Sequence, residues 1–188
     1  MIPDREKARS LVAEGEELNP GPWGRHCAWT AFCAERIASH VGLDPDRAYV
    51  SGMLHDIGRR FGKGHLAHVY DGYRYMKELG YEEIARICLT HSFSVPSLDA
   101  YIGKLDVSLE KQREIQSLLE ELQFDDYDLL IQLCDAMATA DGVVPMEERM
   151  RDVKHRYGSY PQEKWESNIA LKVYFDNKAG TDIYELMK

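Results

Sequence analysis

Apolar residues recur three and four positions apart along almost the whole chain, and runs that alternate apolar with polar residues are scarce. This spacing places apolar side chains on one face of an α-helix, whereas a half-buried strand requires alternation. The pattern therefore predicts an all-α fold. A chain of 188 residues, 44% hydrophobic and 29% charged, is long enough to bury a core of ordinary size, so we expect one domain over residues 1–188.

Turn signals divide this pattern into helices. Asn19-Pro20-Gly21-Pro22 ends the first helix and Gly42 ends the second, while Asp44 before Pro45 is typical of a helix start. A glycine-rich basic loop is expected at residues 59–64 and a looser stretch at residues 92–107. The predicted helices are Pro3–Leu18, Trp23–Val41, Pro45–Gly58, His65–Leu79, Tyr81–His91, Ser108–Leu122, Tyr127–Ala140, Met146–Tyr157 and Pro161–Asp176.

Charge and composition exclude several classes of protein. With 23 basic and 32 acidic residues, the chain has a net charge of −9 and no basic stripe, so binding of duplex nucleic acid is not expected. No apolar run reaches the ~18–20 residues that span a bilayer, and Met1–Lys7 lacks the apolar part of a secretion signal, which predicts a cytoplasmic location. Cys27, Cys33, Cys88 and Cys134 lie among apolar neighbours and are expected to be free, buried thiols.

Histidines and aspartates on apolar helical faces are the candidates for chemistry. His55 and Asp56 stand side by side at an apolar helix end, where an unpaired carboxylate is costly to bury. His26 lies on an inward stripe, His91 ends another apolar helix, and Asp135 is the single charge in an apolar segment. Taken singly, each also fits a structural role, such as a satisfied core histidine or a partner of a helix end.

Taken together, these residues are typical of metal ligands that converge from different helices. Imidazole and carboxylate ligands suit iron, manganese or zinc with positions left open for water or substrate. The cysteines lack the spacing of a structural zinc site. His65 and His68 both align with the apolar face of one predicted helix, so the stripe alone does not separate them.

With these residues the sequence resembles the HD-domain superfamily of metal-dependent phosphohydrolases. The family pattern H…HD…D is met in order by His26, His55-Asp56 and Asp135, and the segment Leu54–Gly58 is close to the most typical form of the motif. The resemblance covers about residues 20–145. It implies an HD-type helical bundle, with an added N-terminal helix and a C-terminal helical extension at about residues 146–188.

The resemblance also implies a ligand set. In relatives with two metals, the first added histidine stands four residues before a glycine, a spacing that His68 has with Gly72 and that His65 lacks. His91 fits the second added histidine. Two divalent ions are implied, with iron expected first and manganese or another divalent ion as alternatives. One ion would be held by His26, His55, Asp56 and Asp135, and the other by His68 and His91 with Asp56 as a bridge.

The implied reaction is hydrolysis of a phosphoester or phosphoanhydride in a nucleotide or other small phosphorylated metabolite, through attack of a metal-bound hydroxide. His55 and Asp56 would be the catalytic pair. Arg59, Lys104 and Arg25 are expected to bind phosphate, Arg59 first because a guanidinium can bind phosphate bidentately. The dinucleoside tetraphosphatase type is the most similar two-metal branch, and the Gly-Tyr-Pro segment of cyclic-dinucleotide phosphodiesterases is absent.

Two other functions use the same residues and stay open. A diiron oxygenase would hold iron with the same ligands and consume O₂. A non-catalytic sensor would bind a nucleotide and contact a partner through the C-terminal helices, where Trp165, Ile169 and Val173 form an apolar stripe that otherwise packs in the core. Self-association into an oligomer is compatible with each of these functions.

Overall fold

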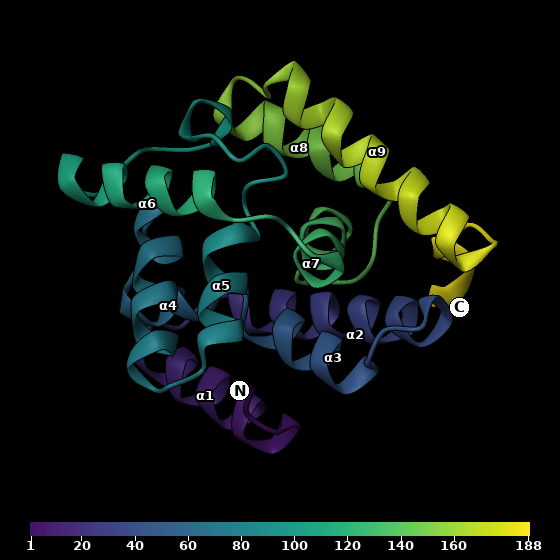
Figure 1. The fold of residues 1–188 in the computed structure, drawn as a ribbon, viewed down its shortest axis with the longest axis horizontal. Helices are drawn as coiled ribbons and strands as arrows, with labels where there is room; N and C mark the ends of the chain where they lie inside the picture. The colour runs from purple at the N-terminus through teal and green to yellow at the C-terminus, as the bar shows by residue number, and fades with distance from the viewer.

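The computed structural model describes residues 1–188, and every regular element in it is helical (Figure 1). The single strand-like contact is an isolated bridge between Ala138 and Val143. The predicted all-α fold is therefore confirmed. The α-helices are α1 (Arg5–Leu18), α2 (Trp23–Val41), α3 (Pro45–Leu54), α4 (Leu66–Glu78), α5 (Glu82–Thr90), α6 (Leu109–Glu121), α7 (Asp126–Met137), α8 (Met146–Tyr157) and α9 (Gln162–Ala179); the 3-10 helices are η1 (Ile57–Phe61), η2 (Leu98–Ala100) and η3 (Ile183–Met187).

α3 is shorter than the sequence predicts. It ends at Leu54 rather than at Gly58, and the chain continues as the 3-10 helix η1 in part of what was expected to be a loop. His55 still has helical dihedrals, but Asp56 leaves them with φ −103° and ψ 14°. Apolar spacing does not detect this change because the apolar pattern continues through it. His55 and Asp56 therefore lie in a turn between two helices, where adjacent side chains can point to different places.

The C-terminal half also departs from the predicted boundaries. α7 ends at Met137, earlier than predicted, because Ala138 is extended and pairs with Val143. α9 runs longer than predicted and ends at Ala179, before Gly180, which has a left-handed φ of 70°. No helix combines the length and the apolar character needed to cross a bilayer.

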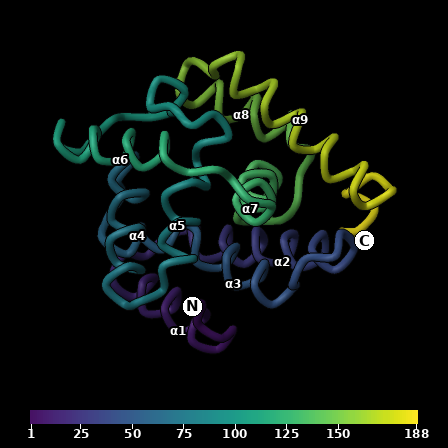
Figure 2. The backbone as a smooth tube through the Cα atoms, in the orientation of Figure 1, coloured from purple at the N-terminus to yellow at the C-terminus, as the bar shows by residue number.

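Two apolar cores hold the helices together. The first core joins α1, η1, α4 and α6, and the second joins α7, α8, α9 and η3, while α2, α3 and α5 contribute residues to both. Figures 1 and 2 show α7 end-on near the middle of the molecule, between α2 and α3 below and α8 and α9 above. α7 packs against α2, α3, α5, α8 and α9. Residues on α7 are thus close to elements from every part of the chain.

The cysteines are divided evenly between the cores. Cys27 and Cys88 are buried in the first core, and Cys33 and Cys134 in the second. Burial raises the pKa of all four thiols, and none forms a disulfide. The expectation of free, buried thiols is confirmed.

The apolar stripe on α9 is only partly buried. Trp165 and Ile169 pack against the second core, as does the fully buried Phe175. Val173 instead is 52% exposed. Most of the predicted stripe therefore serves to attach α9 to α7 and α2.

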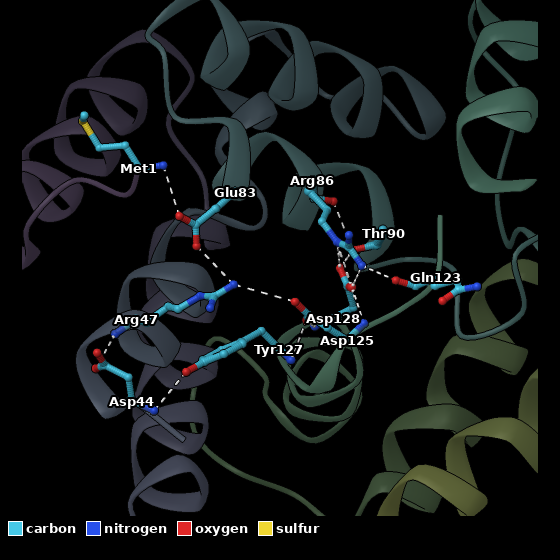
Figure 3. A network of polar contacts seen from close by, with 10 residues as sticks. All are labelled: Met1, Asp44, Arg47, Glu83, Arg86, Thr90, Gln123, Asp125, Tyr127 and Asp128. Carbon is cyan, nitrogen blue, oxygen red and sulfur yellow. Dashed lines mark hydrogen bonds and ion pairs between the residues drawn. The ribbon is translucent and has the colours of Figure 1, made fainter. Parts of the chain in front are cut away.

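A buried polar network fixes α5 against the start of α7 (Figure 3). The carboxylate of Asp128, which is fully buried, accepts hydrogen bonds from Arg86 Nε at 2.9 Å, Thr90 Oγ1 at 2.7 Å and the backbone N of Asp125 at 2.8 Å. Asp125 in turn caps the first turn of α7. These bonds position two helices that carry predicted metal ligands.

Removal of the Asp128 carboxylate is expected to destabilise the fold strongly. In Asp128→Ala the guanidinium of Arg86 and the hydroxyl of Thr90 lose their buried partner, which costs about 3–5 kcal/mol in the free energy of unfolding. Urea denaturation followed by circular dichroism measures this loss. Glu147→Ala breaks an exposed ion pair with Arg151 and is expected to change stability little. Equal, small losses in both variants would contradict the role given to the network.

Candidate metal centre

The six predicted ligands gather in two groups of three, although they come from five places in the chain. α2, α4 and α7 each supply one residue, the turn after α3 supplies two, and the C-terminal end of α5 supplies the last. Within each group the ligand atoms lie within 4.8 Å of one another. The first triad is His26, His55 and Asp135, and the second triad is Asp56, His68 and His91.

The ligand atoms of the first triad lie close enough together to reach one common ion. His26 Nε2 lies 2.9 Å from Asp135 Oδ1 and 3.3 Å from His55 Nε2, and His55 Nε2 lies 3.8 Å from Asp135 Oδ1. Atoms that bind one ion at about 2.1 Å stand about 3.0–3.4 Å from one another. The spacing of the first triad is therefore close to that of three ligands on one cation.

The second triad has similar dimensions. Asp56 Oδ1 lies 3.1 Å from His68 Nε2 and 3.5 Å from His91 Nε2, and the two nitrogens are 3.3 Å apart. The triads adjoin, because the ring centroids of His55 and His91 are 5.1 Å apart. Two cations would thus be neighbours in one site.

Backbone carbonyls orient three of the four imidazoles. In each of these rings Nδ1 contacts the carbonyl oxygen three residues earlier, and a carbonyl can only accept, so Nδ1 carries the proton and Nε2 presents a lone pair. Burial lowers the pKa of His55 to about 4 and also lowers the pKa of His68, so both rings are neutral at pH 7. The pairs are His55 with Gly52 at 2.7 Å, His68 with His65, and His91 with Cys88 at 2.8 Å.

Because Nδ1 carries the proton, the lone pairs of the Nε2 atoms face other hydrogen-bond acceptors. In the second triad the lone pairs of His68 Nε2 and His91 Nε2 point at each other and at Asp56 Oδ1, which is buried and receives no hydrogen bond. In the first triad the lone pair of His55 Nε2 likewise faces the carboxylate oxygen Asp135 Oδ1, at 3.8 Å. Buried acceptors at these distances repel unless a cation lies between them. The donor set of each triad therefore fits a divalent metal ion.

The grouping differs from the one that the resemblance implies. Asp56 was expected to join the first group and to bridge two ions, but only its Oδ1 faces a triad, the second. Its Oδ2 accepts a hydrogen bond from Arg59 Nε. Although burial alone would raise it, the charge of the Arg59 guanidinium holds the pKa of the Asp56 carboxyl well below its usual range. The ligands divide three and three because the turn after α3 sends His55 and Asp56 in different directions.

A cavity of about 560 Å³ is lined by five of the six ligands. Its walls come from the α1–α2 loop, the segment from η1 to α4, α7, and the C-terminal helices α8 and α9. Five lysines and arginines line it against two carboxylates, both of which belong to the triads. Although the chain has a net charge of −9, the lining of this cavity has more basic than acidic side chains. The five are Arg59, Lys63, Arg149, Arg156 and Lys164.

Of the three cations expected to bind substrate, only Arg59 lines the cavity. Lys104 is exposed in the loop before α6 and is not brought to the cavity. Arg25 is also exposed and donates to Asp141 at 3.3 Å. Adjacent helical residues diverge by about 100°, so Arg25 points away from the site that its neighbour His26 faces. The structure therefore does not bring Lys104 or Arg25 into the cavity lining, and their role in substrate binding stays a prediction.

The structure also adds residues that sequence reasoning missed. Arg149, Arg156 and Lys164 reach the cavity through the packing of α8 and α9. No spacing in the sequence connects them to the His-Asp motif. The one available signal was the position of Lys164 beside the buried stripe of α9, where a lysine is unusual.

Comparison with known families assigns the chain to a family. The sequence model of the HD domain matches residues 23–140, well over half of the chain, and all six ligands lie inside the match. The chain belongs to the HD domain family. HD domains bind divalent metals, and the family is one of metal-dependent phosphohydrolases. No curated protein and no solved structure matches the chain. The HD match excludes α1, α8 and α9.

Proposed function

We propose that this HD protein is a metal-dependent phosphohydrolase that cleaves a phosphoester or phosphoanhydride bond in a nucleotide or other small phosphorylated metabolite. The observation that supports this function best is the pair of triads, five of whose six residues line one cavity with basic walls. The basic walls attract an anion although the protein as a whole is acidic. The cavity volume of about 560 Å³ lies in the range of about 300–1,000 Å³ that is typical of small-ligand sites.

Different side chains would bind the metal ions and the substrate. Divalent ions bound in the triads would supply Lewis acidity toward water and phosphoryl oxygens. The carbonyl bonds to Nδ1 keep His55, His68 and His91 aimed into the triads, so little reorganisation is needed when an ion binds. Arg59 is fixed to Asp56 through Nε, which leaves its terminal Nη donors for a phosphoryl oxygen in the cavity.

Metal removal tests this function directly. Protein purified without chelator or nickel affinity is expected to carry up to two divalent ions per chain and to release phosphate from at least one member of a panel of nucleotides and sugar phosphates. Treatment with EDTA should abolish phosphate release, and Mn²⁺ or Fe²⁺ should restore it, because the triads act through the ions they hold. Elemental analysis and a colorimetric phosphate assay measure the two quantities.

Two outcomes would replace this proposal. Turnover of iron-loaded protein that strictly requires O₂ would identify a diiron oxygenase that uses the same ligands. Tight nucleotide binding with no turnover across the panel would identify a sensor. His40→Gln is the control for histidine replacement, because His40 is exposed on α2 and bonds only to the carbonyl of Arg36.

A further inference from the structure

The C-terminal helices form one wall of the metal cavity, although they lie outside the matched HD segment. Figure 1 shows α8 and α9 along the side of α7 that is opposite α2 and α3. α8 supplies Arg149 and Arg156 to the cavity, and α9 supplies Lys164. These helices carry three of the five basic residues in the cavity and none of its carboxylates. We call these three residues the basic wall.

Within the basic wall, Lys164 contacts the backbone of the segment that carries the ligand His91. Its ammonium group donates a hydrogen bond to the carbonyl oxygen of Ser92, the residue directly after the ligand His91. An ammonium group has three donors, and no carboxylate forms an ion pair with Lys164. Burial lowers its pKa to about 8, and the charge of Asp135 in the first triad opposes this shift. The side chain is thus a half-buried cation with unused donors next to the segment that carries His91.

Arg149 and Arg156 extend the basic wall along α8. They are seven residues apart, about two helical turns, so they project from the same face of the helix. Both contact the carboxylate of Asp152, at 3.9 Å and 2.9 Å, so two guanidinium groups share one carboxylate. The hydroxyl of Tyr160, also in the cavity lining, accepts a hydrogen bond from Asn168 at 2.7 Å and keeps its own proton to donate. The wall therefore has excess positive charge and free donors.

We propose that the basic wall binds a second anionic group of the substrate, apart from the phosphoryl group that reacts at the triads, with Lys164 and Arg149 as its main cationic ligands. This inference rests on the proposed hydrolase function and narrows its substrate to small molecules with two anionic groups. A single phosphoryl group engages the triads and Arg59, which leaves the cations on α8 and α9 without a ligand. Their placement in the same cavity as the triads suits an anion that extends across the cavity.

Binding of small anions tests this proposal without turnover. Calorimetric titration of metal-loaded protein compares phosphate with Mg²⁺-saturated pyrophosphate and with phosphonoacetate, which carries a carboxylate as its second anion. Wild-type protein is expected to prefer at least one of the two-group probes over phosphate by about tenfold or more, because charge-assisted hydrogen bonds to the second group add affinity. Lys164→Met should remove this preference, and Lys164→Arg should keep most of it.

Controls separate binding from folding. Lys154→Met removes an exposed lysine of α8 that is outside the cavity, and it should keep the wild-type preference. If Lys164 only supports the turn at Ser92, Lys164→Met will lower the unfolding temperature without changing the ratio of affinities, and the proposal fails. If Lys164→Met does not fold, Arg149→Gln should still reduce the preference, and an unchanged ratio in that variant overturns the proposal.

The two proposals can fail separately. Phosphate release with an affinity ratio that is unchanged by Lys164→Met rejects the basic wall and keeps the hydrolase. A preference that depends on Lys164, without phosphate release from any substrate, rejects the hydrolase and keeps the basic wall as an anion-binding site. Preference for pyrophosphate alone identifies a second phosphoryl group, whereas preference for both probes identifies a general second anion.

Discussion

Asp135→Asn is expected to remove one divalent ion per chain and to reduce kcat/KM for phosphate release about a thousandfold. Asparagine keeps the size of the side chain but removes the only negative charge of the first triad, leaving His26 and His55 as neutral ligands. A thousandfold loss corresponds to about 4 kcal/mol of transition-state stabilisation. Elemental analysis and phosphate release measure the two effects. The fold should survive, because the Asp135 side chain is 27% exposed and contacts only its triad partners.

A companion set of variants tests how the ligands are grouped. His91→Gln is expected to remove the ion of the second triad and to leave that of the first, whereas His40→Gln should leave both. Asp56→Asn separates the two arrangements: a division of three and three predicts the loss of one ion, while a bridging carboxylate predicts the loss of both. Loss of both ions from Asp56→Asn would therefore contradict the grouping seen in the structure.

Gly58→Ala is expected to be among the most destabilising single replacements in the chain. A Cβ atom at position 58 would lie 1.9 Å from the carbonyl oxygen of His68 and 2.5 Å from the amide nitrogen of Gly72. Both are backbone atoms of α4, so neither can rotate away, and η1 would have to separate from α4. We expect a loss of more than about 3 kcal/mol in the free energy of unfolding. The unfolding temperature should fall by about 6–12 °C.

Gly80→Ala is the matched control for this prediction. Gly80 has a φ of +78° but open space around its Cα, so alanine there meets only backbone strain, about 1 kcal/mol. Because Gly58 contacts the carbonyl of the ligand His68, folded Gly58→Ala protein should also hold less metal in the second triad. Thermal unfolding and elemental analysis measure both effects. Similar stability of the two variants would show that η1 and α4 do not approach this closely.

The helices, and the residues that gather into the two triads, are the parts of this protein that the sequence predicts well. Spacing of apolar residues detects which face of a helix is buried, and that spacing places His26 and Asp135 on inward faces. In the HD family the first added histidine stands four residues before a glycine, and this spacing selects His68, which precedes Gly72, rather than His65. The structure puts His68 in a triad and His65 outside it. These features depend on local order along the chain, which a sequence displays directly.

Features that depend on packing between distant segments could not be predicted in this way. The turn at Asp56 is accompanied by a close approach of backbone atoms between η1 and α4, which no pattern of side chains reports. The pairing of Asp56 with Arg59 follows from that turn and decides which triad Asp56 joins. Lys164 meets Ser92 across 72 residues of sequence, and only the packing of α9 brings them together.

The even distribution of free cysteines gives this chain internal reporters of local opening. An alkylating reagent can reach Cys27 or Cys88 only when the first core opens, and Cys33 or Cys134 only when the second core opens. The labelling rates of the two pairs can be compared with metal and without it. If metal slows the labelling of one pair only, the ions stabilise one core; if it slows both pairs, the ions stabilise both cores.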